Sequence, residues 1–470
     1  MPDRRIIRRN RVGSPTTVPS ESGSGESGSG EPVSNEPGSR HPVAPVAPAG
    51  RDLVIDLARV TAVVLVVIIH LLMIGVGFDA TGAIVMSRPL EAQAGFAGAT
   101  WIGQIMPLFF VAGGFTGLVA WRSLVRRGGD WVDFVRGRTL RLGPPTLPLF
   151  VFFAVAIGAA TASGVDPAML AYVAAGTGSP LWFLAAFLLA QVLVPLMARL
   201  HEHTPGATMA VLAAGAIVVD LARIATGIVD IGLVNLLFVW LFVQQLGFWY
   251  RDGWFFRRRA LTLVALAAGA WLLIAPPVVA GWYSADMLVN LNPPTVPLML
   301  LGIAQASLLA ALHRPLDAFM RTRPVQAVAY VVGSRAMTIY LWHLPVIIAV
   351  MGLTLVIPGA APEPASVAWW LTRPIVFIVV AAIVLGISMW LVRFERVPTA
   401  ILEGRRRPGA AAVVVAAVLA FIPTFLVMEF FLDLRIAIVG VVLGVGSRLL
   451  LRPRRTAIDG AAQAATGRAG

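Results

Sequence analysis

The stretch RDLVIDLARVTAVVLVVIIHLL, from Arg51 to Leu72, is typical of a membrane-spanning helix, because its second half is almost entirely apolar. A helix of about 20 mostly apolar residues is long enough to cross a bilayer. Three ionisable residues, Asp56, Arg59 and His70, lie within this run or at its ends. Each such group costs a few kcal/mol or more in hydrocarbon, so it persists where it lines a protected or water-filled space. The stretch therefore indicates a helix with a buried polar face.

The whole chain has the composition of a polytopic membrane protein. Of its 470 residues, 58% are hydrophobic and only 13% are charged, and its mean hydropathy is +0.81. A soluble globular domain carries about twice this share of charged residues. Cysteine is absent, which excludes a disulfide framework, a thiolate nucleophile and a cysteine metal site.

Apolar segments long enough to be predicted as spans recur along the chain. The twelve segments cover residues 53–76, 101–121, 142–163, 181–198, 207–222, 229–249, 260–280, 295–312, 333–357, 374–392, 410–431 and 434–451. In a bilayer, a helix satisfies all its backbone hydrogen bonds internally. The predicted fold class is therefore all-α, a polytopic transmembrane helix bundle.

The arginines test the order of these spans. If the N-terminus is cytoplasmic, the cytoplasmic connections carry Arg122, Arg126, Arg127, Arg136, Arg138, Arg141, Arg199, Arg251, Arg257, Arg258, Arg259, Arg314, Arg321, Arg323, Arg393, Arg396, Arg405, Arg406 and Arg407. The external connections then carry only Arg88, Arg223, Arg373 and Arg435. Basic residues accumulate in cytoplasmic loops, so this asymmetry predicts that both termini are cytoplasmic, in a multi-pass protein of the plasma membrane. It also accounts for most of the net charge of +13 without nucleic-acid binding.

The two ends of the chain differ from the apolar part between them. Residues 1–50 combine a basic cluster with a Gly-, Ser- and Pro-rich segment that has no apolar period. This composition predicts a disordered cytoplasmic tail, and we predict a second one over residues 456–470. No apolar segment with a cleavage site directly follows the N-terminal arginines, so this tail is not predicted to be a signal peptide.

The ionisable residues of the first predicted span share one face of the helix. The eleven positions from Arg59 to His70 complete about three turns and rise about 16 Å. Asp56 falls on this face one turn earlier. The stripe predicts the wall of a passage, with Arg59 toward the cytoplasm and His70 in the middle or outer half. Two plainer interpretations stay open: Asp56 and Arg59 as a structural ion pair, and His70 as an interfacial residue bound to a carbonyl.

Five motifs occur in an order that resembles a known family. The first is the arginine followed eleven residues later by a histidine in the first span. The others are MPLFFVAGGFTG (Met106 to Gly117), FVRGRTLRLGPP (Phe134 to Pro145), SPLWFLAAFLLAQVLVPL (Ser179 to Leu196) and IYLWHLPV (Ile339 to Val346). Together they resemble the acyltransferase-3 family of integral membrane acyltransferases over residues 51–395.

The resemblance implies a ten-helix acyltransferase core, with about two additional C-terminal helices in residues 396–455. It also implies transfer of an acyl group, commonly acetyl, from cytoplasmic acyl-CoA to a hydroxyl of a cell-envelope glycan, lipid or small molecule. The family often has two arginines four apart before the third helix. Here Arg136, Arg138 and Arg141 are two and three apart, so the matching pair stays open. No GDS-type hydrolase motif accompanies the core.

Each polar residue then has an expected role. The family match and its chemistry make His70 the candidate general base, because an imidazole takes up a proton near neutral pH. Arg59, oriented by Asp56, is expected to meet the pantetheine or the developing oxyanion. The candidates for the CoA phosphates are Arg136, Arg138 and Arg141, since guanidinium groups bind phosphate in a bidentate way. These three arginines are also explained as topological anchors.

Arg335 and His343 are two further candidates within predicted spans. Helix packing with one hydrogen bond is the plainer interpretation of His343, because no spacing ties it to a reaction. His201, His203 and His313 are predicted in cytoplasmic loops, and no metal site is predicted. Two rival functions stay open: a transporter or flippase of an envelope precursor, and an envelope scaffold whose polar stripe binds a partner helix.

Overall fold

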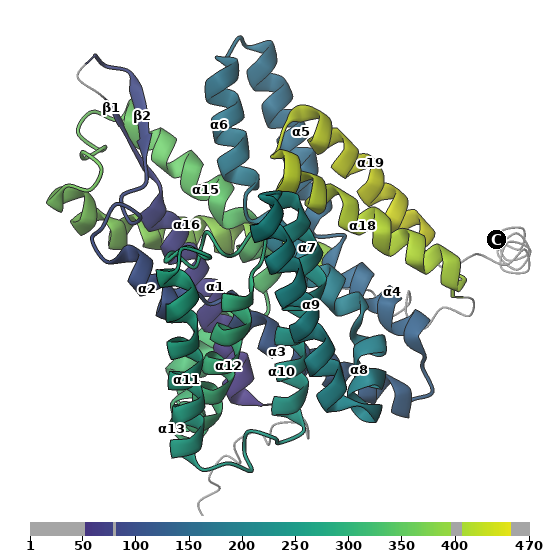
Figure 1. Ribbon diagram of the computed structural model, residues 1–470. Coiled ribbons are helices and arrows are strands. Elements are labelled where there is room, and N and C mark those ends of the chain that lie inside the picture. Colours follow the sequence, from purple (N-terminus) through teal and green to yellow (C-terminus); the bar gives the residue numbers. More distant parts are fainter. Residues whose placement is uncertain (1–51, 79–80, 396–406, 453–470) are drawn as a thin grey trace, which may run out of the picture. The chain divides into compact units, whose positions relative to one another are not determined.

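The protein is described by a computed structural model of residues 52–78, 81–395 and 407–452 (Figure 1). In chain order its elements are α1 (Leu53–Met73), β1 (Gly75–Phe78), β2 (Ile84–Ser87), α2 (Phe96–Gly103), α3 (Met106–Arg126), α4 (Trp131–Leu142), α5 (Thr146–Ala162), α6 (Pro167–Gly178), α7 (Leu181–Val192), α8 (Val194–His203), α9 (Pro205–Thr226), η1 (Val229–Val234), α10 (Asn235–Arg251), α11 (Ala260–Val279), α12 (Val296–Ala311), α13 (His313–Met320), α14 (Arg323–Gly333), α15 (Ala336–Val356), α16 (Val367–Glu395), α18 (Ala410–Phe430) and α19 (Leu434–Leu450). The predicted tails, 1–50 and 456–470, lie outside the described residues.

These elements confirm an all-α, multi-pass membrane protein. Ten helical segments of the described residues are long and apolar enough to cross a membrane, and the pair α12 and α13, bent by 68°, would make eleven. Twelve spans were predicted, and each of them falls on helix. The difference is α19, whose 17 residues rise only about 26 Å. Crossing the hydrocarbon core takes about 30 Å.

The two ends of helix α1 are set by an N-cap residue and by a hairpin, neither of which the apolar run predicts. The Asp52 side chain caps the helix by accepting from the backbone N–H groups of Val54 and Ile55. The helix ends at Met73, and the chain then forms an antiparallel hairpin in which Gly75 pairs with Ser87. The first predicted span extended to residue 76, so the hairpin was not anticipated. A side chain at Gly75 would collide with Ser87 and Pro364, which is why glycine is required there.

One end of the bundle collects connections that were predicted to be cytoplasmic. Asp52 contacts His313 Nε2 at 3.2 Å, and Arg122 joins Asp252 at 2.5 Å and Glu202 at 3.2 Å. These residues come from α1, α3, α8, α13 and the segment after α10. Their helices α8 and α13 lie at the lower end of Figure 1.

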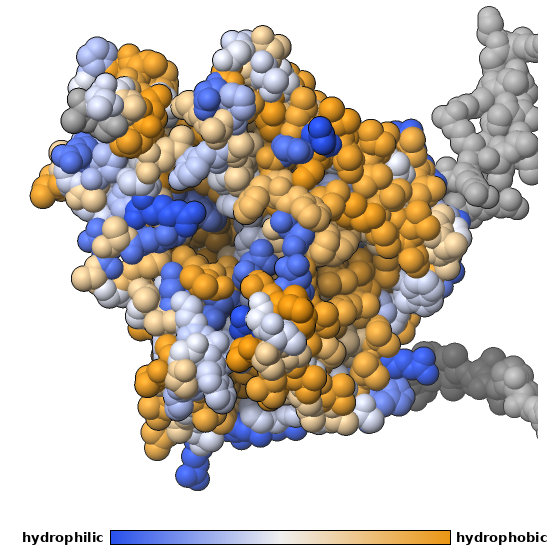
Figure 2. Space-filling view, turned by 45° about the horizontal axis from the view of Figure 1, so that its top comes forward, coloured by the Kyte–Doolittle hydropathy of each residue, from blue (hydrophilic) through white to orange (hydrophobic). Residues whose placement is uncertain are grey.

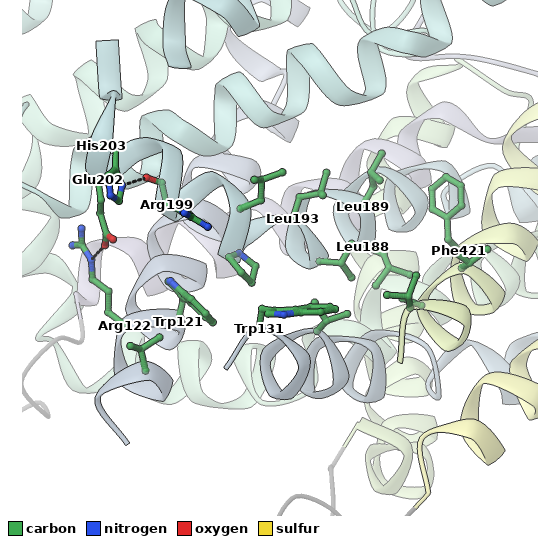
Figure 3. Close-up of a pocket in the computed structure, with 18 of the residues that line it drawn as sticks. Trp121, Arg122, Trp131, Leu188, Leu189, Leu193, Arg199, Glu202, His203 and Phe421 are labelled. Carbon is green, nitrogen blue, oxygen red and sulfur yellow. Dashed lines mark hydrogen bonds and ion pairs between the residues drawn. The ribbon is translucent and has the colours of Figure 1, made fainter. Parts of the chain in front are cut away.

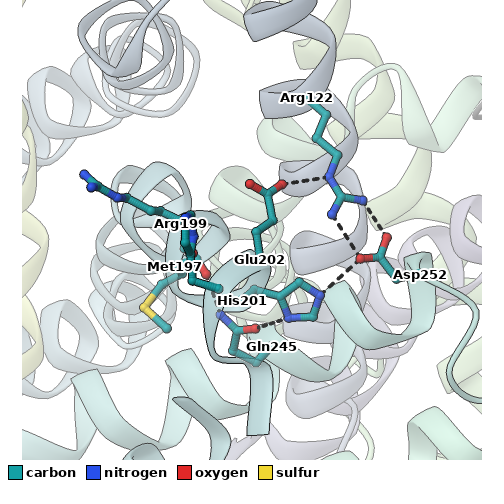
Figure 4. A network of polar contacts seen from close by, with 8 residues as sticks. Arg122, Met197, Arg199, His201, Glu202, Gln245 and Asp252 are labelled. Carbon is teal, nitrogen blue, oxygen red and sulfur yellow. Dashed lines mark hydrogen bonds and ion pairs between the residues drawn. The ribbon is translucent and has the colours of Figure 1, made fainter. Parts of the chain in front are cut away.

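A polar network at this end includes a histidine that was expected in a loop. His201 lies instead on α8, buried, and bonds to Gln245 at 3.0 Å and Asp252 at 3.2 Å (Figure 4). Burial opposes the charge on Asp252, but hydrogen bonds from His201 and Arg122 outweigh it and lower the pKa of this carboxyl. The network therefore holds α3, α8 and α10 together through a carboxylate that stays ionised.

The opposite end collects connections that were predicted to be external. Asp220 of α9 is buried and accepts hydrogen bonds from Asn235 at 2.9 Å, from the Tyr283 hydroxyl at 2.8 Å and from the Val296 N–H at 2.9 Å. Trp101 Nε1 donates to the Ala285 carbonyl at 2.7 Å. Connections assigned to one side from the sequence therefore contact one another, which agrees with the predicted alternation of the spans.

Arg373 was predicted to lie in an external connection, and this prediction is wrong. Arg373 lies within α16, because this helix begins seven residues earlier than the predicted span. The Arg373 side chain is buried, donates from Nε to the Trp369 carbonyl at 3.1 Å and stacks on the Trp369 ring at 4.3 Å. This local pairing explains how an arginine is tolerated inside an apolar helix.

The centre of the bundle depends on a close crossing of α3 and α10. Gly114, in the motif MPLFFVAGGFTG, lies against the backbone of Gln244, and Gly247 lies against the backbone carbonyl of Val111. A Cβ atom at either glycine would collide with the facing main chain. Small residues allow membrane helices to approach in this way. The second motif of the resemblance therefore has a packing role.

Gly114→Ala is expected to destabilise the folded protein by about 1–3 kcal/mol, because α3 and α10 must separate to admit the methyl group. Thermal unfolding of the purified protein in detergent would measure the loss. Gly137→Ala is the matched control, since it adds a methyl group to helix α4 with nothing within 4 Å. Equal unfolding temperatures for the two variants would contradict the close crossing.

The two C-terminal helices pack on the core through α4, α5 and α7. Arg407 bonds to Asp130 and Asp133 at the start of α4, at 2.7 and 2.8 Å. Arg136 of α4 is buried and donates to the Leu451 carbonyl at the end of α19, at 3.1 Å. The outer flank of α18 and α19 exposes apolar side chains (Figure 2), among them Val415, Ile438 and Val442.

Candidate active site

A cavity of about 670 Å³ opens between α1, α3, α4, α7, α15 and α16. Its lining residues are Arg59, Val63, Phe109, Thr116, Ala120, Arg138, Arg141, Leu142, Phe183, Leu184, Phe187, Gln191, Tyr330, Gly333, Ser334, Arg335, Ala336, Met337, Tyr340, Val392 and Glu395. Four of these side chains are guanidinium groups and one is a carboxylate. The cavity therefore combines an aromatic wall with an excess of positive charge.

The arginines of this cavity lie close enough to act on one another. Asp56 and Arg141 are the charged groups whose fields act on Arg59, and Arg138 experiences both Arg141 and Arg59. The Arg138 guanidinium stacks on the Phe134 ring at 4.9 Å, and its Nη2 is buried with no hydrogen-bond partner among the described residues. Buried donors are nearly always paired, so this cluster is suited to an anionic ligand that would supply the missing acceptors.

Glu395, the carboxylate of the cavity, already has partners. It accepts from the backbone N–H of Thr338 at 2.6 Å and from the Thr338 hydroxyl. It thereby caps the first turn of α15. The hydrogen bonds of Glu395 are thus made to this helix end, while its charge also acts on Arg141 and Arg335.

Arg335 was predicted to lie inside a span, but it lies at the start of a helix. It is the residue before α15, with a non-helical conformation, because α14 ends at Gly333 and the chain bends there. Its guanidinium donates to the Val331 carbonyl at 3.3 Å and to the Ser334 hydroxyl at 3.0 Å. The break between the two helices brings this arginine to the cavity wall.

The three arginines of α4 do not form one site. Arg138 and Arg141 line the cavity, whereas Arg136 points away from it and anchors Leu451. The helical period of the sequence could have indicated this difference between the three arginines. Positions 138 and 141 lie about 60° apart on the helix, while position 136 lies about 160° from 138. The spacing of two and three residues therefore separates one structural arginine from two that face the cavity.

His70 and His343 form a pair across α1 and α15. The Nδ1 of His70 lies 2.8 Å from the Nε2 of His343, and the Nδ1 of His343 lies 2.6 Å from the Tyr340 carbonyl. A carbonyl only accepts, so Nδ1 of His343 carries the proton. In neutral His343, Nε2 is then an acceptor, and His70 donates to it from Nδ1. This tautomer, assigned from the hydrogen bonds, leaves the lone pair of His70 on Nε2.

The sequence held no signal for this pair. The two histidines are 273 residues apart, and His343 was a further candidate for which helix packing was the plainer interpretation. It is completely buried, but its ring also orients the candidate base. A histidine that fixes the tautomer of another has the positioning role that carboxylates and carbonyls have in other sites.

Arg59 and His70 were expected to face a common cavity, and only Arg59 lines it. The cavity follows α1 as far as Val63, and His70 lies two turns, about 10 Å, further along nearly the same face. Tyr340 connects the two regions, because its side chain lines the cavity while its carbonyl holds His343. The histidine pair therefore lies beyond the inner end of the basic cavity.

Together, the fold and this site define a multi-pass helical membrane protein with a basic cavity and, beyond its inner end, a pair of histidines between α1 and α15. The chain belongs to the acyltransferase-3 family: a family model described as an acyltransferase domain matches residues 52–393. No curated protein and no solved structure matches the chain. The family match ends within α16, so α18 and α19 lie beyond it.

Proposed function

We propose that this membrane acyltransferase moves an acyl group, acetyl in the first instance, from cytoplasmic acyl-CoA to a hydroxyl group. The acceptor is a glycan, lipid or small molecule of the cell envelope. The observation that carries the proposal is the cluster of Arg59, Arg138, Arg141 and Arg335 around one cavity, with a buried Arg138 nitrogen that has no hydrogen-bond partner in the described part of the chain.

The donor is held at this cluster. Its phosphates are multiply charged, and guanidinium groups bind such oxygens with paired, charge-assisted hydrogen bonds. Arg138 and Arg141 face the cavity from α4, and Arg335 faces it from the start of α15. The aromatic wall of Phe109, Phe183 and Phe187 suits the less polar arm that carries the thioester. This arm would extend along α1 past Arg59, away from the arginines of α4.

His70 acts as the general base. The acceptor oxygen attacks the thioester carbonyl carbon while Nε2 of His70 takes the hydroxyl proton. The tetrahedral intermediate then breaks its carbon–sulfur bond, and the proton passes to the departing thiolate. His343 keeps His70 in the tautomer that this step requires. Because Arg59 lies about 16 Å from His70 along the helix, we assign Arg59, oriented by Asp56, to the donor's arm rather than to the oxyanion.

Release of CoA distinguishes this function from its rivals. Vesicles that contain the protein and an envelope extract are given acetyl-CoA labelled in the acetyl group. The enzyme releases free thiol and transfers label to an acceptor, whereas a transporter, flippase or scaffold releases none. Comparison of the glycans and lipids of a deletion strain by mass spectrometry would then identify the acceptor by the loss of one acyl mass.

Donor use from the cytoplasm requires the predicted topology. Reporter fusions after Arg127 and after Arg259 are expected to report cytoplasm, and fusions near Asp166 and Asp286 the outside, because arginines accumulate in the first two regions. A paired reporter with one cytoplasmic and one external activity measures each site. Opposite results at two of the four sites would contradict both the topology and the side from which the donor binds.

A further inference from the structure

A second, larger groove lies apart from the basic cavity. It measures about 1060 Å³ and runs between α3, α4, α7, α8 and α18 (Figure 3). One wall is formed by Val414, Ala417, Val418 and Phe421 of α18. Since α18 lies outside the matched family domain, this groove depends on the C-terminal extension.

The groove is apolar along most of its length and polar at one end. Leu188, Leu189 and Val192 of α7 face Phe421 of α18 across it. Figure 3 shows Arg122, Glu202 and His203 together at one end and Phe421 at the other. Two tryptophans, which favour the boundary between lipid and water, lie on a wall between them: they are Trp121 and Trp131.

The polar end carries positive charge that the protein does not neutralise. Arg122 is engaged by Asp252 and Glu202. The exposed side chains of Arg126 and Arg199 have no hydrogen bond or ion pair within the part of the chain that the structure describes. Both arginines lie at the end of the bundle that is predicted to be cytoplasmic. An apolar groove that ends in free guanidinium groups at this depth matches a phospholipid with an anionic head group.

We propose that the groove binds an anionic phospholipid, with its phosphate at Arg126 and Arg199 and its acyl chains against α7 and α18. The C-terminal helices thus complete a lipid site beside the acyltransferase domain. A partner helix is a poorer occupant, because it would have to bring a carboxylate to the arginines through an apolar region. Every anionic phospholipid of this leaflet already has a phosphate at the required depth.

Native mass spectrometry of the full chain tests the proposal. Protein extracted from vesicles of phosphatidylglycerol and phosphatidylcholine with equal chains is expected to retain phosphatidylglycerol preferentially. Each arginine that binds the phosphate directly is expected to contribute about tenfold, so Arg126→Gln with Arg199→Gln is expected to lower retention about 100-fold. The matched control is Arg127→Gln with Arg314→Gln, which removes the same charge at the same end outside the groove and leaves retention unchanged. Equal loss in the control, or no preference in the unmodified protein, would overturn the proposal.

Two further measurements keep the test independent of folding and of charge. Ala417→Trp fills the groove without changing any charge and is expected to abolish retention; if retention is unchanged, the lipid binds elsewhere. A photoreactive residue in place of Val418 is expected to add the mass of one phospholipid in native membranes. A cross-link to a polypeptide instead would assign the groove to a protein partner and overturn the lipid site.

Discussion

His70→Ala is expected to lower acyl transfer by about 10²- to 10⁴-fold while the protein still inserts and folds. The substitution removes the only group proposed to take the acceptor proton. It also leaves Nε2 of His343 without its partner, at a cost of about 1–3 kcal/mol of stability. The initial rate of CoA release in vesicles, normalised to folded protein, measures the effect.

Two other histidine variants separate catalysis from structure. His203→Ala is the control, because His203 is exposed and, among the residues that the structure describes, bonds only to the carbonyl of Arg199, one turn away. Its rate is expected to stay unchanged. His343→Ala is expected to lower the rate less than His70→Ala does, since the base remains but loses its fixed tautomer. A rate for His70→Ala within a few-fold of the unmodified enzyme would show that the histidine pair only joins α1 to α15.

Arg138→Gln with Arg141→Gln is expected to raise the KM for acyl-CoA about tenfold or more for each guanidinium removed. Hydrogen bonds to charged groups contribute about 1.5–3 kcal/mol each, and every 1.4 kcal/mol corresponds to a factor of ten. Because the acceptor does not bind at these arginines, its KM is expected to change little. Steady-state rates with each substrate varied in turn measure the two constants separately.

The same helix supplies the control for this prediction. Arg136→Gln removes an identical charge two residues away, but it breaks the contact with Leu451 at the end of α19. It is therefore expected to lower the unfolding temperature without changing the KM for acyl-CoA. If Arg136→Gln alone raised this KM, or if the double variant left it unchanged, the phosphate site would have to lie elsewhere.

Much of the fold could be predicted from short stretches of sequence. All twelve predicted spans are helical, and the contacts at the two ends of the bundle join connections that were assigned to the same side. Arg59 was singled out as a charged residue inside an apolar helix, and it lines the basic cavity. The spans could be predicted because hydropathy acts locally: a helix in lipid must satisfy its own backbone hydrogen bonds. The cytoplasmic location of the arginines stays a prediction.

Other features depend on where a helix breaks. The first predicted span continued to residue 76, into the start of the hairpin, and the bend before Arg335 was predicted as continuous helix, because these residues are apolar enough to extend a span. In each case a tertiary contact decides: Gly75 packs on Pro364, and Glu395 from α16 caps the start of α15 at Thr338. These contact partners lie far away in the sequence, so the composition of the segment itself does not reveal them.

The sequence by itself determined the membrane class, the order of the spans, the resemblance to one acyltransferase family and the arginine within the first helix. Only the tertiary structure decided that His70 meets His343, that Arg136 leaves the arginine cluster, and that α18 closes an apolar groove. The physical reason is that periodicity encodes which face of a helix is polar, whereas contacts between helices depend on crossings such as that of Gly114 and Gly247. At such contacts between helices, residues that are hundreds of positions apart meet, and no spacing in a single sequence predicts which residues these are.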